Sequence, residues 1–226
     1  MLLNNSNPPY RKVGTTACYM VFGFGIFYAI VTTIGLLTLK SPQDAIGDPY
    51  FTIMEMMSIL IALLMTISMA AVHQYALQAD KVFSLLSLIF MSVTTGITSC
   101  VHFLVLSVSN SAEAKLLSHH SLYFSFKWPS VVYALDILAW DLFFGISMLF
   151  AAPVFKRKLS EKKINILLIS CGIFSLIGLM GVPLQNMQLR NIGIIGYAVI
   201  APVAFLFIGK ILGQANHEKN KNLNEV

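Results

Sequence analysis

Charged residues are scarce in this chain. Only 11% of its 226 residues are Asp, Glu, Lys or Arg, whereas 57% are hydrophobic and the mean hydropathy is +0.75. A soluble domain has about 25% charged residues, so this chain has too few to cover a surface that faces water. The scarcity argues against an ordinary soluble domain and favours helices that face lipid.

The sequence also lacks the common motifs of catalysis and cofactor binding. It contains no HExxH, no Glu-x-x-His pair, no GxSxG, no phosphate-binding loop and no dinucleotide fingerprint. Its cysteines, Cys18, Cys100 and Cys171, lie in three separate apolar segments, which indicates inert thiols rather than a disulfide framework or a metal site. We therefore expect no cofactor and no bound metal.

Long apolar runs are abundant, and their lengths predict transmembrane helices. A helix of about 20 residues spans the hydrocarbon core, and a helix satisfies the hydrogen bonds of its own backbone in lipid. The candidate spans are 17–39, 50–72, 82–108, 128–155, 164–183 and 191–212. They predict an all-α integral membrane protein, a bundle of six transmembrane helices over 17–213, with an N-tail at 1–16 and a C-tail at 214–226.

Basic residues predict the orientation of this bundle. If the N-terminus is cytoplasmic, all of the 15 lysines and arginines except Lys40, Lys115, Lys127 and Arg190 lie on the cytoplasmic side. This asymmetry follows the positive-inside rule, so we expect both termini in the cytoplasm and the protein in the plasma (inner) membrane.

A short cytoplasmic loop carries the densest basic cluster. Its members are Lys156, Arg157, Lys158, Lys162 and Lys163. Near a membrane surface each basic residue attracts anionic lipid headgroups by about 1 kcal/mol, so we expect lipid headgroups as partners. Because no aromatic residues alternate with these charges, we expect no nucleic-acid partner.

Ionisable residues also occur inside the apolar runs. An aspartate near the bilayer centre costs roughly 2.5–3.5 kcal/mol, yet the fourth run contains both Asp136 and Asp141. With the predicted orientation, Glu55, His102 and Asp136 come from three helices to a similar depth in the outer part of the bundle. The sequence therefore predicts a polar pocket that opens to the extracytoplasmic side.

Helix phase refines this pocket. Ser99 shares a face of the third span with His102, and Tyr133, Asp136 and Trp140 share a face of the fourth. In an α-helix Asp141 points about 140° away from Asp136, so we expect the two aspartates to serve different helix contacts. Asp141 is then a deeper interhelical partner or a proton carrier. The candidate site residues are Glu55, His102, Asp136, Asp141, Ser99, Tyr133, Trp140 and Arg190.

Three classes of function stay open at this stage. In the first, the pocket binds or transports a small cationic or polar solute, and its carboxylates exchange protons. In the second, the protein is an intramembrane enzyme for a lipid or isoprenoid, with Asp136 or Glu55 as general acid and His102 as base. In the third, the chain is an accessory subunit of a membrane complex.

Overall fold

The chain folds into a bundle of long helices. The computed structural model describes residues 9–41, 44–109 and 111–223, with side chains up to residue 214, and no strand occurs in these ranges. Six helical segments are long and apolar enough to cross a membrane: Pro9–Leu37, Tyr50–Tyr75, Gln78–Ser107, Val131–Phe155, Leu159–Leu179 and Met187–Gln214. The helical class and the number of long apolar segments agree with the sequence prediction.

The first three segments are regular helices, whereas the last three are composite. The first three comprise α1 (Pro9–Leu37), α2 (Tyr50–Tyr75), and α3 (Lys81–Ser107) with the 3₁₀ turn η1 (Gln78–Asp80) before it. The fourth comprises α6 (Val131–Ile137), η2 (Leu138–Phe143), α7 (Phe144–Ala151) and η3 (Ala152–Phe155). The fifth comprises η4 (Leu159–Glu161) and α8 (Lys162–Leu179), and the sixth comprises α9 (Met187–Ile194), η5 (Ile195–Ile200) and α10 (Ala201–Leu223). Both η2 and η5 are π-helical.

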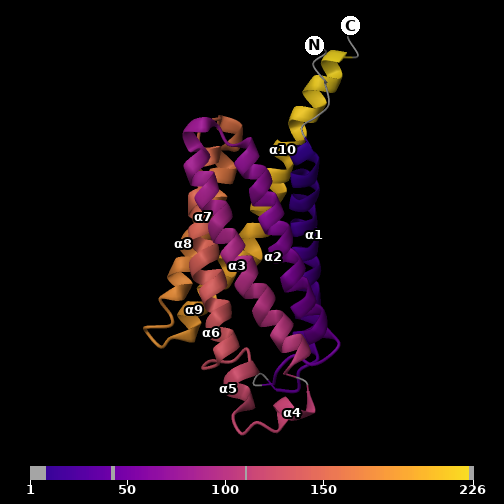
Figure 1. The fold of residues 1–226 in the computed structure, drawn as a ribbon, viewed down its shortest axis with the longest axis vertical. Helices are drawn as coiled ribbons and strands as arrows, with labels where there is room; N and C mark the ends of the chain where they lie inside the picture. Colours follow the sequence, from indigo (N-terminus) through magenta and orange to yellow (C-terminus); the bar gives the residue numbers. More distant parts are fainter. Residues whose placement is uncertain (1–8, 42–43, 110, 224–226) are drawn as a thin grey trace.

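The two ends of the bundle differ. Helix α1 begins and α10 leaves the bundle at the same end, which we call the termini end (Figure 1). The short helices α4 (Ala112–Lys115) and α5 (His120–Phe124) lie at the opposite end, which we call the loop end (Figure 1). Six segments, an even number, run along the bundle, so the first segment begins at the end where the sixth finishes.

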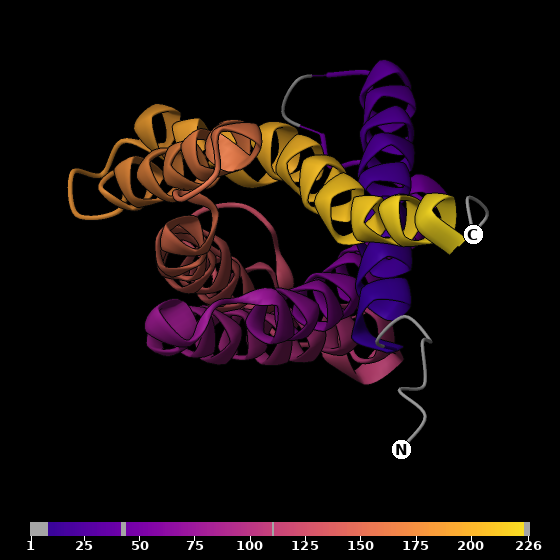
Figure 2. The same cartoon turned by 90° about the horizontal axis from the view of Figure 1, so that it is seen from above.

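Helix packing leaves one side of the bundle less closed than the other. Helix α1 packs on α2 and on α10, α3 packs on α2 and α7, and α8 packs on α7, α9 and η5. Viewed along the bundle, the α9–α10 segment crosses α1 steeply, so their loop-end parts diverge (Figure 2). The last close contact before they diverge is at Gly25, where an added Cβ would lie 2.9 Å from Pro202 Cγ.

The termini-end half of the bundle is tightly packed. Phe144, Phe155 and Phe205 are fully buried there, as are Met65 and Leu168. Buried hydroxyls add hydrogen bonds between helices, because a polar group away from water needs a partner. The hydroxyl of Ser147 donates to the carbonyl of Ser87 at 2.8 Å, and that of Thr95 donates to the carbonyl of Ala62 at 2.8 Å.

Ion pairs close the termini end. Arg157 donates from Nε and Nη2 to the two carboxylate oxygens of Asp80, at 2.8 and 3.2 Å. The hydroxyl of Tyr75 donates to Glu161, whose carboxylate also lies 3.5 Å from the ammonium of Lys158. These contacts join the turn between α2 and α3 to the segment before α8. The sequence analysis did not predict them.

Two helices begin earlier in the sequence than the predicted spans 17–39 and 191–212. Helix α1 begins at Pro9, within the predicted N-tail, since proline is well suited to the first helical turn. Helix α9 begins at Met187, because the side chain of Asn186 accepts hydrogen bonds from the backbone of Gln188 and Leu189, at 3.0 and 3.1 Å. The sixth segment therefore includes Arg190, which precedes the predicted span.

Candidate functional site

A cavity of about 720 Å³ lies in the loop-end half of the bundle. Such a volume is within the range of small-molecule sites, which is roughly 300–1,000 Å³. Its apolar walls come from all sides and include Gly25, Met54, Ile61, Met65, Ala198 and Pro202. The ionisable residues Glu55, His102, Asp136 and Arg190 also line it.

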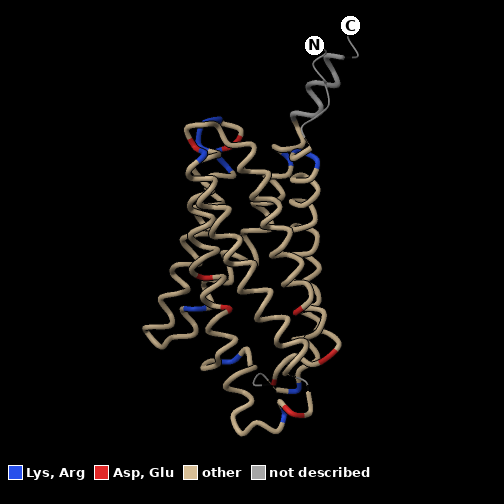
Figure 3. The backbone as a smooth tube through the Cα atoms, in the orientation of Figure 1, with Lys and Arg blue, Asp and Glu red and all other residues tan. Residues whose placement is uncertain are grey.

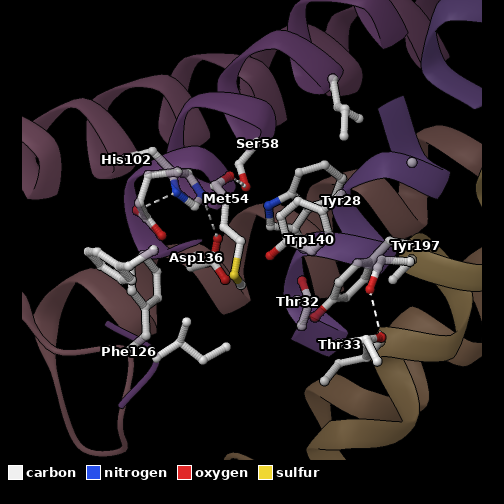
Figure 4. Close-up of a pocket in the computed structure, with 18 of the residues that line it drawn as sticks. Tyr28, Thr32, Thr33, Met54, Ser58, His102, Phe126, Asp136, Trp140 and Tyr197 are labelled. Atoms are coloured by element: carbon white, nitrogen blue, oxygen red, sulfur yellow. Dashed lines mark hydrogen bonds and ion pairs between the residues drawn. The ribbon is translucent and has the colours of Figure 1, made fainter. Parts of the chain in front are cut away.

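Three of the predicted site residues meet at one wall of this cavity (Figure 4). The Nδ1 atom of His102 lies 2.7 Å from Glu55 Oε2, and its Nε2 atom lies 3.5 Å from Asp136 Oδ1. Glu55 is 4% exposed and His102 is 5% exposed, so water screens these contacts only weakly. Helices α2, α3 and α6 thus bring an imidazole between two carboxylates.

Arg190 joins this group of three and connects it to a further ionisable residue, Asp141. Its Nη2 atom lies 3.9 Å from Asp136 Oδ2, and its Nε atom lies 3.3 Å from Asp141 Oδ2. The guanidinium also lies over the rings of Tyr133 and Tyr197, at 4.9 and 6.0 Å from their centroids. Side chains from α2, α3, α6, η2 and α9 therefore form a continuous ionisable cluster: Glu55, His102, Asp136, Arg190 and Asp141.

The expected division between Asp136 and Asp141 is seen only in part: Asp136 lines the cavity beside His102 and Asp141 is a buried partner of Arg190 on another helix, but the two side chains do not point apart. Both carboxylates face Arg190, although an α-helix would turn them about 140° apart. The cause is the π-helical segment η2, which begins at Leu138 and so includes most of the chain between the two aspartates. Because the π-helix pairs residues i and i+5, a spacing of five brings two side chains to nearly the same face. Asp141 is fully buried and is not a lining residue of the cavity.

Aromatic rings surround the cluster. Phe126, from the loop before α6, stacks on the ring of His102 with the centroids 5.4 Å apart. On the side toward the termini end, the rings of Trp140 and Tyr197 lie 5.3 Å apart, and Phe144 packs against both. The cavity thus has aromatic residues on both the loop-end and the termini-end sides of the cluster.

The remaining candidates have other positions. Trp140 lines the cavity, whereas Tyr133 contacts Arg190 from outside the cavity lining. Ser99 is half-buried on α3 and is not a lining residue. Sequence reasoning missed Phe126, Tyr28 and Tyr197, since single aromatic residues in apolar runs resemble ordinary core residues. The N-cap residue Asn186 was a readable signal that the sixth helix begins early enough to include Arg190.

The charge of the cluster is unbalanced. Three carboxylates face two basic side chains, so with every group ionised the cluster carries one negative charge. A neutral imidazole donates through one nitrogen only. A neutral imidazole that donates to Glu55 therefore has no proton to offer Asp136, whereas an imidazolium can pair with both carboxylates. Chemically, the cluster has room for one more proton or one bound cation.

Metal binding has no support in this geometry. Among residues 9–41, 44–109 and 111–223, no group of three or more His, Cys, Asp or Glu side chains is arranged to hold a metal ion. The basic side chain of Arg190 next to Asp136 also competes for the carboxylate that a metal would need.

Comparisons with protein-family models, curated proteins and solved structures gave no match to this chain. Functional interpretation therefore depends on the geometry of the cavity and its ionisable cluster.

Proposed function

We propose that the chain is a multi-pass protein of the plasma membrane with both termini in the cytoplasm. The apolar segments support insertion, since six of them have the required length and hydropathy. The distribution of charge supports the orientation, because basic residues gather at the termini end (Figure 3). The loop end, with the cavity, is then the extracytoplasmic side.

We further propose that the cavity binds a small solute with a cationic or strongly polar group and exchanges protons as it does so. The observation that carries this proposal is the ionisable cluster on the cavity wall, in which two bases face three carboxylates. A bound cation neutralises the excess carboxylate as a proton does. Solute and proton therefore compete for the same charge, which is the physical basis of coupling between them.

Transport requires that this cavity also open toward the termini end. That path is filled by Trp140, Tyr197 and Phe144, which contact one another. The π-helical segments η2 and η5 contribute two of these rings, and π-helical turns occur frequently at functional sites. A change of these segments toward regular α-helix would rotate the rings, so we propose them as the moving part of the transport cycle.

A second function, acid–base catalysis on a lipid or isoprenoid, is favoured by one observation. His102 lies between two carboxylates at the wall of a largely apolar cavity, where an imidazole and a carboxyl group can move a proton to or from an apolar substrate. A chemical product distinguishes this enzyme from a binding protein, because binding alone returns the ligand unchanged.

The basic loop at the termini end has a proposed role of its own. Lys156, Lys162 and Lys163 are exposed, while Arg157 and Lys158 contact Asp80 and Glu161. We propose that the exposed ammonium groups attract anionic headgroups by about 1 kcal/mol each.

The test of proton-coupled binding is a panel of small organic amines added to the purified protein. We expect stabilisation against heat by at least one amine, and proton release when its binding heat is measured in buffers of different ionisation enthalpy. Glu55→Gln and Asp136→Asn each remove a carboxylate that can pair with the ammonium, a charge-assisted contact of about 1.5–3 kcal/mol, and should weaken binding roughly ten- to hundredfold. Glu113→Gln is the control, because Glu113 is exposed on α4 and does not line the cavity.

Other outcomes of the same experiment are equally informative. Equal binding by wild type, Glu55→Gln and Asp136→Asn contradicts the proposal. Conversion of a membrane lipid extract by wild type but not by His102→Gln identifies the enzyme instead. If the protein neither binds an amine nor converts a lipid, both functions are wrong. The accessory-subunit hypothesis is then tested by measuring assembly with a partner.

A further inference from the structure

We propose that the solute is a single-chain cationic amphiphile, which enters the cavity sideways from the lipid between α1 and the α9–η5 part of the sixth segment. Its amine group binds at Glu55 and Asp136, and its hydrocarbon chain extends back toward the lipid. This inference rests on the proposed function, whose site it uses, and adds the chemical class of the ligand and its route.

The route follows from residues that are at once cavity-lining and exposed. On α1 these are Ala29 and Thr33, and on the sixth segment they are Ile194 and Val199, which is 59% exposed. We call these four residues the lateral mouth. Because residues of both helices line the cavity and are exposed, we infer that the cavity reaches the surface between these two helices. Asp44, Ala45 and Lys127 also line it and are exposed, so the cavity has a second opening at the loop end.

The crossing of the two helices explains why the opening exists. Helices α1 and α10 are in close contact from Gly14 and Leu212 to Gly25 and Pro202, and they diverge beyond that point toward the loop end (Figure 2). Ala29 and Thr33 follow Gly25 by one and two turns, while Val199 and Ile194 precede Pro202 by one and about two turns. The lateral mouth therefore lies in the space between the two helices, where they diverge beyond Gly25 and Pro202.

The surface around the mouth is the kind that faces hydrocarbon. Ile26 and Ile30 on α1 are 46% and 51% exposed, and Ile195 and Val203 on the sixth segment are 43% and 36% exposed. Both helices are at this point well inside segments that are apolar enough to span a membrane. A molecule that enters here comes from the lipid phase, which concentrates amphiphiles and excludes small hydrophilic ions.

Polarity changes across the cavity in the direction that such a ligand requires. His102 and Asp136 lie on one side, and Thr32 and Thr33 of α1, whose side chains carry no charge, lie on the other (Figure 4). Between them the walls are largely apolar, with Gly25, Ala198 and Pro202 near the helix crossing. A ligand with a polar group at one end and hydrocarbon at the other matches this arrangement.

Charge selects an amine rather than an acid as the polar group. Among the charged residues that line the described cavity, Arg190 already lies against Asp136 and Asp141, and the exposed Lys127 and Asp44 carry opposite charges, so the excess carboxylate belongs to the ionisable cluster. The extra carboxylate repels a carboxylate or phosphate and attracts an ammonium. The rings of Trp140 and Phe126 near the cluster add surfaces on which a cation is also favourable.

The experiment uses the full chain in nanodiscs of phosphatidylcholine. The probe is hexadecylamine with a photoreactive diazirine in its chain, and the cross-linked peptides are identified by mass spectrometry. We expect cross-links to residues of α1 and η5, competition by unlabelled hexadecylamine, and no competition by hexadecanoic acid.

Two variants narrow the mouth, each with a matched control on the same helix. Val199→Trp and Ala29→Trp should reduce cross-linking at least about tenfold, equal to ~1.4 kcal/mol in apparent affinity. Ile195→Trp and Ile30→Trp, exposed but outside the cavity lining, should leave it unchanged. Since all four positions are exposed to lipid, the larger side chain does not have to enter the packed core.

The outcomes separate this inference from the proposed function. The inference of a cationic amphiphile that enters from the lipid is wrong if hexadecanoic acid competes as well as hexadecylamine. It is also wrong if the mouth variants and their controls lose cross-linking equally. If butylamine still binds the protein and depends on Glu55 and Asp136, the proposed function survives that result. If neither amine depends on Glu55 and Asp136, both proposals are wrong.

Discussion

Arg190 holds together two aspartates that the chain could not otherwise bury. Its side chain is almost inaccessible, at 3% exposure, and it contacts Asp136 and Asp141 while lying over the rings of Tyr133 and Tyr197. Both oxygens of Asp141 lack a hydrogen-bond partner among the described residues, so its charge is balanced by the ion pair. A buried charge without a partner is strongly destabilising.

We therefore predict that Arg190→Met destabilises the folded protein by about 3–5 kcal/mol, because it leaves the fully buried carboxylate of Asp141 without its ion-pair partner. The measurement is the free energy of unfolding in a detergent titration. Adding Asp141→Asn to Arg190→Met should recover part of the loss by removing one uncompensated charge. An unchanged stability in Arg190→Met would show that the guanidinium does not compensate the aspartates.

At the scale of helices, α8 and α9 approach each other through glycine. An added Cβ at Gly178 would lie 2.6 Å from Gly193 Cα and 2.7 Å from Gly193 N, so backbone rather than a flexible side chain fills the space. An added Cβ at Gly193 would overlap the carboxylate of Asp141. This close contact holds α9, and with it Arg190, against the aspartates of the fourth segment. The π-helical turn η2 then directs both aspartates to Arg190.

We predict that Gly178→Ala lowers the free energy of unfolding by about 1–3 kcal/mol, since the helices must move apart. Gly96→Ala is the matched control, because nothing lies within 4 Å of a Cβ at Gly96. The control should be neutral or more stable by about 0.4–1 kcal/mol, through the lower entropy of the unfolded chain. Equal effects of the two substitutions would contradict the close packing of α8 on α9.

At the scale of the whole molecule, charge and cavity lie toward opposite ends. The termini end has the basic loop (Figure 3) and a tightly packed core, whereas the loop-end half has the cavity and the ionisable cluster. If the positive-inside rule orients the bundle, solute access is extracytoplasmic.

Site-directed labelling tests this orientation. In a chain with Cys18, Cys100 and Cys171 replaced by alanine, Ser118→Cys lies in the loop-end connection and Ser160→Cys near the basic loop, both at exposed positions. We predict that a membrane-impermeant maleimide labels Ser118→Cys on intact cells and labels Ser160→Cys only after permeabilisation. The reverse pattern would place the cavity on the cytoplasmic side, and labelling of both on intact cells would contradict the number of crossings.

The sequence by itself determined the class of the molecule and the members of its polar centre. Scarce charge and six long apolar runs predict the helical bundle, because these properties depend only on which residues follow one another. The depth of each residue along its helix also follows from chain position, which is why Glu55, His102 and Asp136 were expected at one level. Their contacts within one cluster agree with that expectation.

Only the tertiary structure decided how the centre is connected and where it opens. The π-helical turn η2 brings Asp141 to the side of Asp136, and this depends on packing against α3 and α8 rather than on the spacing of five residues. The lateral mouth arises because α1 and the sixth segment cross at Gly25 and Pro202 and then diverge. Crossing angles and local changes of helix type are set by contacts between distant parts of the chain, so helix periodicity does not contain them.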